Sequence, residues 1–233
     1  MKPIRIFRHI ATEGPGYFAS YLDSRKLPYE LVCIDAGDAI SQRVDDVSGL
    51  VFMGGPMSVN DDLPWIRQEL GLIRRAADIS MPVLGHCLGG QLISKALGGS
   101  VTENPDKEIG WHPVQVVDNE AARDWLAELP DEFEVFHWHG ETFSLPQHAA
   151  PLLRSGYCAN QAFTIGNMLA LQCHIEMTAA MVEEWIKDSY EFPSGSLSVQ
   201  SLPEIRQNLP AKIDRLQHLA RILYNRWLRP IIN

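Results

Sequence analysis

Short apolar segments alternate with helical patterns through the first hundred residues, and this alternation constrains the fold more than any other feature of the chain. The apolar segments are residues 4–7, 31–34, 50–53 and 83–84. Apolar positions at three- and four-residue spacing predict helices at 17–25, 65–77 and 88–97. A strand–helix–strand succession of this kind indicates βαβ units. We therefore expect an α/β fold in which helices cover both faces of a mostly parallel sheet.

The pattern changes after residue 100. Further strands are predicted at 114–117, 133–136 and 168–172, with a helix at 121–129 and a loop at 191–196. Because few helices separate these strands, we expect a mixed or antiparallel extension of the same sheet. A final helix at about 211–228 has one apolar face, formed by Ile213, Leu216, Leu219, Leu223 and Trp227. We expect this helix to pack on its own domain and residues 1–233 to form one domain.

The charge of the chain argues against some partners. Lys and Arg number 20 against 29 Asp and Glu, a formal net charge of -9, which opposes nonspecific binding to nucleic acid or anionic lipid. Apolar runs fall short of the ~18 residues of a membrane span, and basic residues interrupt the start of the chain as they would not in a signal peptide. We expect a cytoplasmic protein without nucleic-acid or membrane partners. Its four cysteines lack C-x-x-C spacing and are expected to be reduced.

A dinucleotide-binding site is one alternative for the first loop. Residues 14–19 fit G-x-G-x-x-A, and Asp35 lies near the position expected for a ribose-binding acid. However, that fingerprint requires its glycines directly after the first strand, whereas residues 8–13 intervene here. The sequence also contains no G-x-x-x-x-G-K-[ST] phosphate loop. We therefore expect no nucleotide cofactor.

Residues 82–92 carry the strongest chemical signal. They read as a buried strand, the sequence Gly85-His86-Cys87-Leu88-Gly89, and a helix, which is the pattern of a nucleophile elbow with cysteine in place of serine. Side chains at Gly85 and Gly89 would obstruct the sharp bend that exposes the central residue. Cys87 would then stand at a helix N-terminus, where the partial positive charge favours a thiolate. We take Cys33, Cys158 and Cys173 as buried structural thiols.

A cysteine nucleophile needs a base and a group that orients the base. His174 and Glu176 offer both, because they are two residues apart after an apolar segment. If the strand remains extended there, the two side chains project from one face and can meet. Together with the elbow cysteine, the pair fills three catalytic roles.

With these residues in hand, nearly the whole chain resembles the class I, triad-type glutamine amidotransferases, in particular stand-alone domains similar to the glutaminase part of GMP synthase. The resemblance rests on residues 53–58, 85–91, 108–111, 137–140, 160–163 and 172–176. It implies a flavodoxin-like sheet and a catalytic triad of Cys87, His174 and Glu176. It also implies an oxyanion hole formed by the backbone N–H groups of Gly55 and Leu88.

The same resemblance implies that Gln91 and the backbone near Trp138 and His139 hold the substrate. Two departures concern this pocket. The family commonly has Phe-His-Pro-Glu where this chain has residues 173–176, without the proline, and Glu141 replaces a common aspartate. The catalytic pair is retained in both cases.

His137 and His139 admit a different interpretation, because two histidines on one strand face can share a metal ion. No third ligand is evident from the sequence, so we expect no metal and prefer packing or substrate-facing roles.

Three functions remain open. The leading one is hydrolysis of the glutamine side-chain amide through a cysteinyl γ-glutamyl thioester, with release of ammonia and glutamate. The first alternative is a γ-glutamyl peptidase that uses the same triad, and the second is a non-catalytic regulatory or binding subunit. Since no synthetase segment is found in these residues, we expect any ammonia acceptor to be a separate synthetase.

Overall fold

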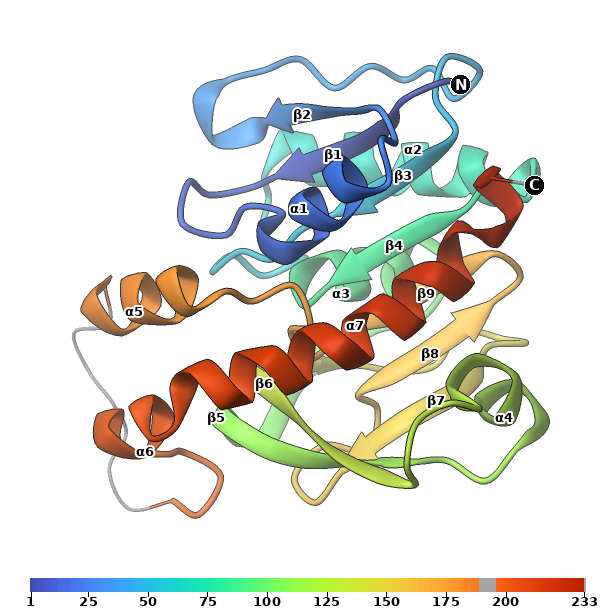
Figure 1. Ribbon diagram of the computed structural model, residues 1–233. Coiled ribbons are helices and arrows are strands. Elements are labelled where there is room, and N and C mark those ends of the chain that lie inside the picture. Colours follow the sequence, from blue (N-terminus) through green and yellow to red (C-terminus); the bar gives the residue numbers. More distant parts are fainter. Residues whose placement is uncertain (189–195, 233) are drawn as a thin grey trace.

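The computed structural model describes residues 1–188 and 196–232 (Figure 1). Its parallel strands are β1 (Ile4–Arg8), β2 (Tyr29–Cys33), β3 (Gly49–Phe52), β4 (Val83–His86) and β9 (Met168–Leu171). Its antiparallel strands are β5 (Val101–Val116), β6 (Glu132–Phe143), β7 (Ala150–Ser155) and β8 (Ala162–Ile165). In the described residues these form one sheet in the order β2-β1-β3-β4-β9-β8-β7-β5-β6. The parallel half therefore meets the antiparallel half between β9 and β8.

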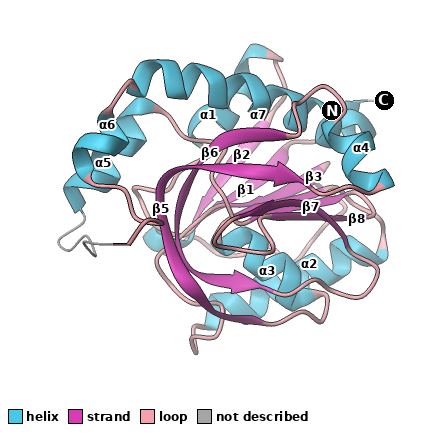
Figure 2. Ribbon diagram, turned by 90° about the horizontal axis from the view of Figure 1, so that it is seen from below, coloured by secondary structure: helices cyan, strands magenta, loops and turns pink. Residues whose placement is uncertain are grey.

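Helices pack on both faces of this sheet (Figure 2). On one face, α2 (Pro64–Asp78) and α3 (Leu88–Ala96) bury Leu72, Ile73 and Leu92 against apolar side chains of the strands. On the other face lie α1 (Gly16–Ser24), α5 (Ala179–Asp188) and α7 (Leu209–Ile232). The short helices α4 (Glu120–Leu126) and α6 (Leu202–Arg206) and a 3₁₀ turn at Ile34–Ala36 complete the described elements. The expected mixed α/β architecture is confirmed.

The elements predicted in the first hundred residues are confirmed with small shifts at their ends. The antiparallel extension is also confirmed, and the predicted final helix lies within the longer α7, with its five apolar residues buried. The predictions for 114–117 and 133–136 were too short, because they cover only one end of β5 and of β6. The sequence also failed to predict β7, β8, α5 and α6. The loop expected at 191–196 lies outside the described residues except for Ser196.

The length of β5 was missed because its apolar alternation is interrupted. Residues 105–107 are exposed, and the pairing of β5 with β6 shifts register between Glu103 and Glu108. Such an irregularity bends the strand and breaks the period of two by which a strand is recognised in sequence.

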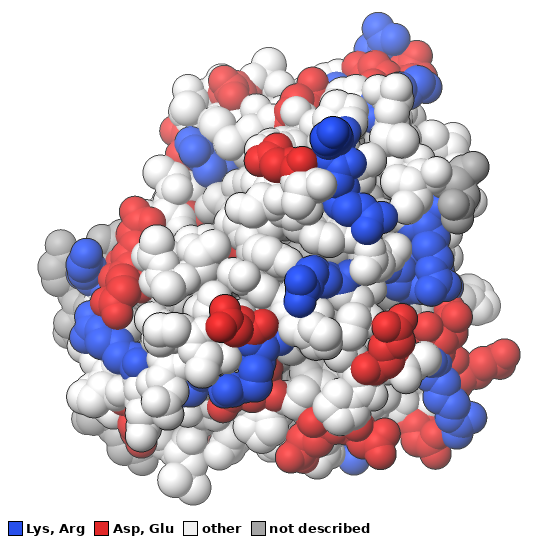
Figure 3. Space-filling model, viewed as in Figure 1, with Lys and Arg blue, Asp and Glu red and all other residues white. Residues whose placement is uncertain are grey.

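The surface carries charges of both signs. On the face seen in Figure 3, basic and acidic side chains are interspersed, without a continuous basic stripe on the described residues in view. Across residues 1–188 and 196–232, no helix combines the length and the apolar character that a membrane crossing requires.

Candidate active site

Cys87 occupies a sharp turn between β4 and α3. Its backbone angles are φ 50° and ψ −106°, a conformation that side-chain-bearing residues rarely adopt. The glycines around it permit the bend: a Cβ at Gly85 would lie 2.3 Å from the carbonyl of Gly89, and a Cβ at Gly89 would lie 2.0 Å from the carbonyl of Phe52. The elbow deduced from the sequence is thus present in the backbone.

The elbow is fixed to the neighbouring strand. The backbone N–H of Cys87 donates to the carbonyl of Leu171 at 2.8 Å, which joins the turn to the end of β9. The Cys87 side chain is 7% exposed and lies at the N-terminus of α3. A thiolate formed here faces the positive end of the helix dipole.

His174 and Glu176 meet just beyond β9. His174 Nδ1 lies 2.7 Å from Glu176 Oε1, and both side chains are buried. The strand does not continue through them, contrary to the extended conformation considered from the sequence. His174 instead forms an isolated bridge, in which its N–H donates to the carbonyl of Phe136 at 2.8 Å. The pairing therefore depends on β6 holding the loop in place.

The electrostatics of this pair favour an imidazolium. Burial by itself lowers the pKa of His174, but the Glu176 carboxylate and the Cys87 sulfur outweigh burial and hold that pKa well above its usual value. Burial likewise opposes ionisation of Glu176, yet His86 and His174 together bring the pKa of Glu176 below its usual value. Because Glu176 occupies Nδ1, the Nε2 atom of His174 is left for proton exchange with a reacting group.

Three side chains surround the His174–Glu176 pair. His86 Nε2 lies 3.7 Å from Glu176 Oε2 and 3.2 Å from the hydroxyl of Tyr224, which comes from α7. Burial lowers the pKa of His86 below its usual value. On the other side, the Trp185 ring of α5 meets His174 edge-on, with ring centroids 4.9 Å apart. These contacts keep bulk water from the imidazole.

The loop after β3 provides a candidate oxyanion-binding group. His9 Nδ1 lies 3.2 Å from the carbonyl oxygen of Gly54, and His9 Nε2 lies 3.0 Å from Glu69 Oε2. Both neighbours are acceptors, so the ring satisfies both only as an imidazolium that donates to each. Burial lowers the pKa of His9, but the charge of Glu69 and the hydrogen bonds to Glu69 and to backbone carbonyls together outweigh burial, so the net shift is upward.

This contact determines where the Gly55 N–H points. The Gly54 carbonyl and the Gly55 N–H belong to one planar trans peptide, so fixing the carbonyl aims the N–H to the opposite side. Leu88 starts α3, and its N–H has no acceptor within the helix. Among the described residues, neither N–H donates a hydrogen bond within the chain. Both are available to a ligand.

Glu13 is a residue of the site that the sequence analysis missed. A Cβ at Gly54 would lie 2.1 Å from Glu13 Oε2 and 3.3 Å from His174 Cε1, so this carboxyl group reaches the imidazole across a glycine. Burial raises the pKa of Glu13 to about 7. The sequence feature that could have revealed Glu13 is its position in the chain. Glu13 and His9 follow β1, at the carboxyl edge of the parallel strands, where ligands bind in open α/β sheets.

Only some of the proposed substrate contacts reach Cys87. Gln91 Nε2 donates to Gln172 Oε1 at 3.2 Å, and Gln172 Nε2 lies 3.6 Å from the Cys87 sulfur. The Trp138 and Trp185 rings are in contact, with centroids 5.8 Å apart, and Trp138 thereby approaches the triad. The side chain of His139 points elsewhere, with its Nε2 3.0 Å from Glu108 Oε2.

The remaining candidates from the sequence have structural surroundings. Gly16 begins α1, and the next backbone N–H, that of Tyr17, donates to the carbonyl of Glu176 at 2.8 Å, so this turn supports the triad loop. Cys158 and Cys173 are buried, and burial raises the pKa of each thiol. Cys33 is only partly buried, on the outermost strand β2, so its expected burial was wrong.

The comparisons with known proteins agree on one family. The model of the family "Glutamine amidotransferase class-I" matches residues 17–190. A glutamine amidotransferase-like protein, YfeJ of Salmonella typhimurium, is 31% identical over 207 residues, covering 85% of this chain and 87% of that protein. The crystal structure of a glutamine amidotransferase from Methylobacillus flagellatus superimposes with a TM-score of 0.95 at 43% identity, covering 99% of this chain and 95% of the other.

A weaker similarity extends to a larger enzyme. The glutamine-hydrolysing GMP synthase of Neisseria meningitidis is 32% identical over 96 residues, which make up 41% of this chain and 17% of that synthase. The similarity therefore concerns only part of the synthase.

Proposed function

This chain belongs to the class I glutamine amidotransferases, and from that premise we propose that it hydrolyses the side-chain amide of glutamine with Cys87, His174 and Glu176 as its catalytic triad. The observation that carries the proposal is the buried His174–Glu176 contact of 2.7 Å next to a cysteine held at a strained elbow. These are the nucleophile, the base and the orienting group that thiol-based acyl transfer requires.

The reaction follows from the roles of the atoms. The Cys87 thiolate attacks the side-chain amide carbon, and the carbonyl oxygen becomes an oxyanion bound by the N–H groups of Gly55 and Leu88. His174 gives a proton to the departing nitrogen, so that ammonia leaves and a γ-glutamyl thioester remains. His174 then takes a proton from water, which attacks the thioester. Glutamate and the Cys87 thiolate are released, and the imidazolium is restored.

The substrate lies against Gln91 and the backbone of residues 138–139 in this proposal. The Gln91–Gln172 contact supports the first part, because it continues to the Cys87 sulfur. The Phe136–His174 bridge supports the second, because it places the strand that continues into Trp138 and His139 beside the triad.

A γ-glutamyl peptidase is the second candidate, and one observation favours an enzyme of this autonomous kind. The Gly54 carbonyl is held by His9 of the same chain, so the Gly55 N–H needs no partner to orient it. An enzyme that receives its substrate from solution needs an oxyanion hole assembled in this way. If ammonia is instead passed on, we propose a synthetase as its acceptor.

The test is a substrate panel. The purified chain is incubated with glutamine and with γ-glutamyl dipeptides while ammonia, glutamate and released amines are measured, and Cys87→Ala serves as the blank. Ammonia and glutamate in equal amounts from glutamine support the glutaminase. Preferential release of amines from the dipeptides selects the peptidase, and release equal to the blank on every substrate rejects both.

A further inference from the structure

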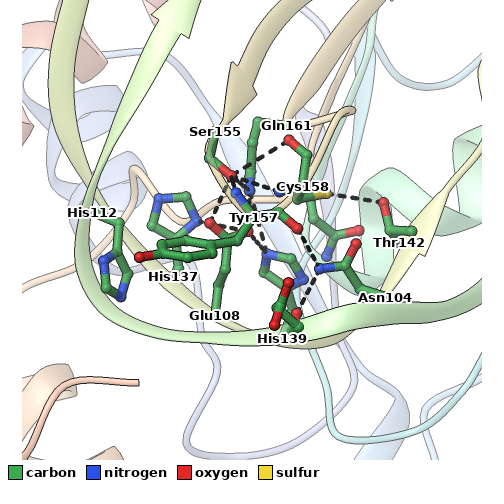
Figure 4. Close-up of polar contacts among 12 residues, drawn as sticks. Asn104, Glu108, His112, His137, His139, Thr142, Ser155, Tyr157, Cys158 and Gln161 are labelled. Carbon is green, nitrogen blue, oxygen red and sulfur yellow. Dashed lines mark hydrogen bonds and ion pairs between the residues drawn. The ribbon is translucent and has the colours of Figure 1, made fainter. Parts of the chain in front are cut away.

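Three buried side chains converge on the antiparallel half of the sheet (Figure 4). Glu108 lies on β5, and His137 and His139 lie two residues apart on one face of β6. Glu108 pairs in register with His139 across the two strands. One ligand atom from each of the three residues lies within 4.8 Å of the others. The third ligand that the sequence did not reveal is thus supplied by strand pairing.

His137 is the first sign that the cluster is incomplete. Its side chain is fully buried, and neither Nδ1 nor Nε2 has a hydrogen-bond partner among the described residues. Buried polar atoms without partners destabilise a folded chain and are uncommon. Nδ1 lies 4.0 Å from Glu108 Oε2, so the unpartnered ring faces the carboxylate without bonding to it.

His139 shows the arrangement of a metal ligand. Its Nδ1–H donates to the carbonyl oxygen of Glu141 at 3.0 Å, and its Nε2 lies 3.0 Å from Glu108 Oε2. Two electron-rich atoms so close together require a proton or a cation between them. Metal-binding histidines commonly donate the other ring N–H to a carbonyl in this way, which fixes the tautomer and the ring orientation.

Glu108 is already held in position by neutral donors. Ser155 Oγ donates to Oε1 at 2.6 Å, and Gln161 Nε2 donates to Oε2 at 2.5 Å. The Gln161 amide oxygen is itself buried without a partner among the described residues. Carboxylates that bind a metal are commonly held by such outer hydrogen bonds.

We propose that Glu108, His137 and His139 form a binding site for one divalent transition-metal ion. Two imidazoles and a carboxylate are the donors that Zn²⁺ accepts, with a fourth position left for water or a further ligand. The ion would replace the proton between Glu108 and His139 and would give His137 its partner. It would also join β5 to β6 next to the register shift between Glu103 and Glu108.

The test is metal titration of the full chain after treatment with a chelator. A Cys87→Ala background removes the thiolate that would otherwise compete for the metal. We expect one equivalent of Zn²⁺ or Co²⁺ to bind, and His137→Leu to lower the affinity at least ~10-fold. The fold should survive this change, because it removes a ring that has no hydrogen bonds to lose.

His112→Leu is the matched control. It removes a neighbouring buried ring that is not one of the three proposed ligands. The centroids of the His112 and His137 rings are 5.8 Å apart. The Ile109 carbonyl to which His112 donates keeps a bond from Gln200 N, so the exchange leaves no orphaned acceptor. The affinity of the His112→Leu variant for Zn²⁺ should be unchanged. Absence of binding in the background protein, or equal affinity in His137→Leu, overturns the proposal.

A second measurement applies even if His137→Leu does not fold. X-ray absorption of the zinc-loaded wild-type chain should show imidazole nitrogen and oxygen ligands without sulfur. Sulfur in the first coordination shell means that the ion sits on a cysteine such as Cys87 or Cys158, and it rejects the site.

Discussion

Cys87 concentrates the proposed chemistry in one residue. Its positive φ and its place before α3 set the sulfur at the positive end of a helix, while the Leu171 carbonyl holds its backbone. We expect Cys87→Ala to abolish turnover without loss of the fold, because alanine fits the same buried turn. Activity is measured with the best substrate of the panel, and folding by circular dichroism. Full activity in this variant would remove the nucleophile assignment.

A glutamine-mimicking electrophile gives an independent check of the same residue. It should label Cys87 before Cys158 and Cys173, because burial raises the pKa of those two thiols whereas Cys87 stands at the N-terminus of α3. Cys33 is the internal control, because it is partly exposed yet lies on the edge strand β2. A general thiol reagent is expected to reach Cys33, so preference for Cys87 must come from substrate recognition.

The two partners of the nucleophile should differ in importance. We expect His174→Ala to lower kcat by ~10²–10⁴-fold, the usual contribution of general acid–base catalysis. Glu176→Gln should cost less, because an amide oxygen can still accept from His174 Nδ1. The measurement is kcat for both variants with matched thermal unfolding. If His174→Ala keeps full activity, the triad is wrong.

Glu13 should make stability depend on pH. Its pKa is about 7 in the folded chain, against 4.5 for the ordinary side chain, so between these values the folded state binds more protons than the unfolded state. The unfolding free energy therefore falls as pH rises through this interval, by at most ~3 kcal/mol. Glu13→Gln removes this term. Urea unfolding is measured from about pH 4.5 to about pH 8. The unfolding free energy of the variant minus that of the wild type should rise up to about pH 7 and stay constant above it. If the unfolding free energies of the variant and the wild type change with pH in parallel, Glu13 does not have a raised pKa in the folded chain.

At the scale of elements, the sequence predicted local features better than pairing between distant segments. The Gly85-His86-Cys87-Leu88-Gly89 elbow was readable because its glycines are needed by one short turn. The His174–Glu176 contact was also foreseen, although the bridge from Phe136 that makes it is a long-range feature. Glu108 could not be joined to His137 and His139, because no local pattern reveals which residues of β5 face β6 across a register shift. The role of His9 depends likewise on a distant partner, Glu69 of α2.

The His9–Glu69 pair supplies the prediction at this scale. Removing one partner would leave a buried charge, so both are replaced, as His9→Leu with Glu69→Leu. Such an exchange of a buried ion pair is often neutral or stabilising. The Gly54 carbonyl loses its donor, however, and a misdirected Gly55 N–H should lower kcat by up to ~10²–10³-fold. KM should change little. An unchanged kcat would show that the pair does not position the oxyanion hole.

The control is the ion pair between Arg8 and Asp35. It joins β1 to the turn after β2 near the same edge of the sheet, with Arg8 Nη2 2.9 Å from Asp35 Oδ2. Arg8→Gln with Asp35→Asn should leave kcat unchanged.

At the scale of the molecule, the proposed site is assembled from loops at one edge of the parallel half of the sheet. His9 and Glu13 follow β1, Gly55 follows β3, Cys87 follows β4 and His174 follows β9. Two helices on one face of the sheet then cover it, since Trp185 comes from α5 and Tyr224 from α7. Every group that the proposed reaction uses is therefore contributed by this chain.

This self-contained assembly predicts turnover that does not wait for a partner. If docking of a synthetase were needed to orient the Gly55 N–H, the free chain would lack one oxyanion donor and lose ~10²–10³-fold in rate. The His9 contact holds that peptide already, so a cell extract depleted of small molecules should stimulate the rate by much less than this factor. The steady-state rate is measured with glutamine and with γ-glutamyl dipeptides, with and without extract, and Cys87→Ala plus extract subtracts the activity of the extract itself. A ~10²-fold stimulation of glutamine hydrolysis would mean that a partner, and not His9, completes the oxyanion hole.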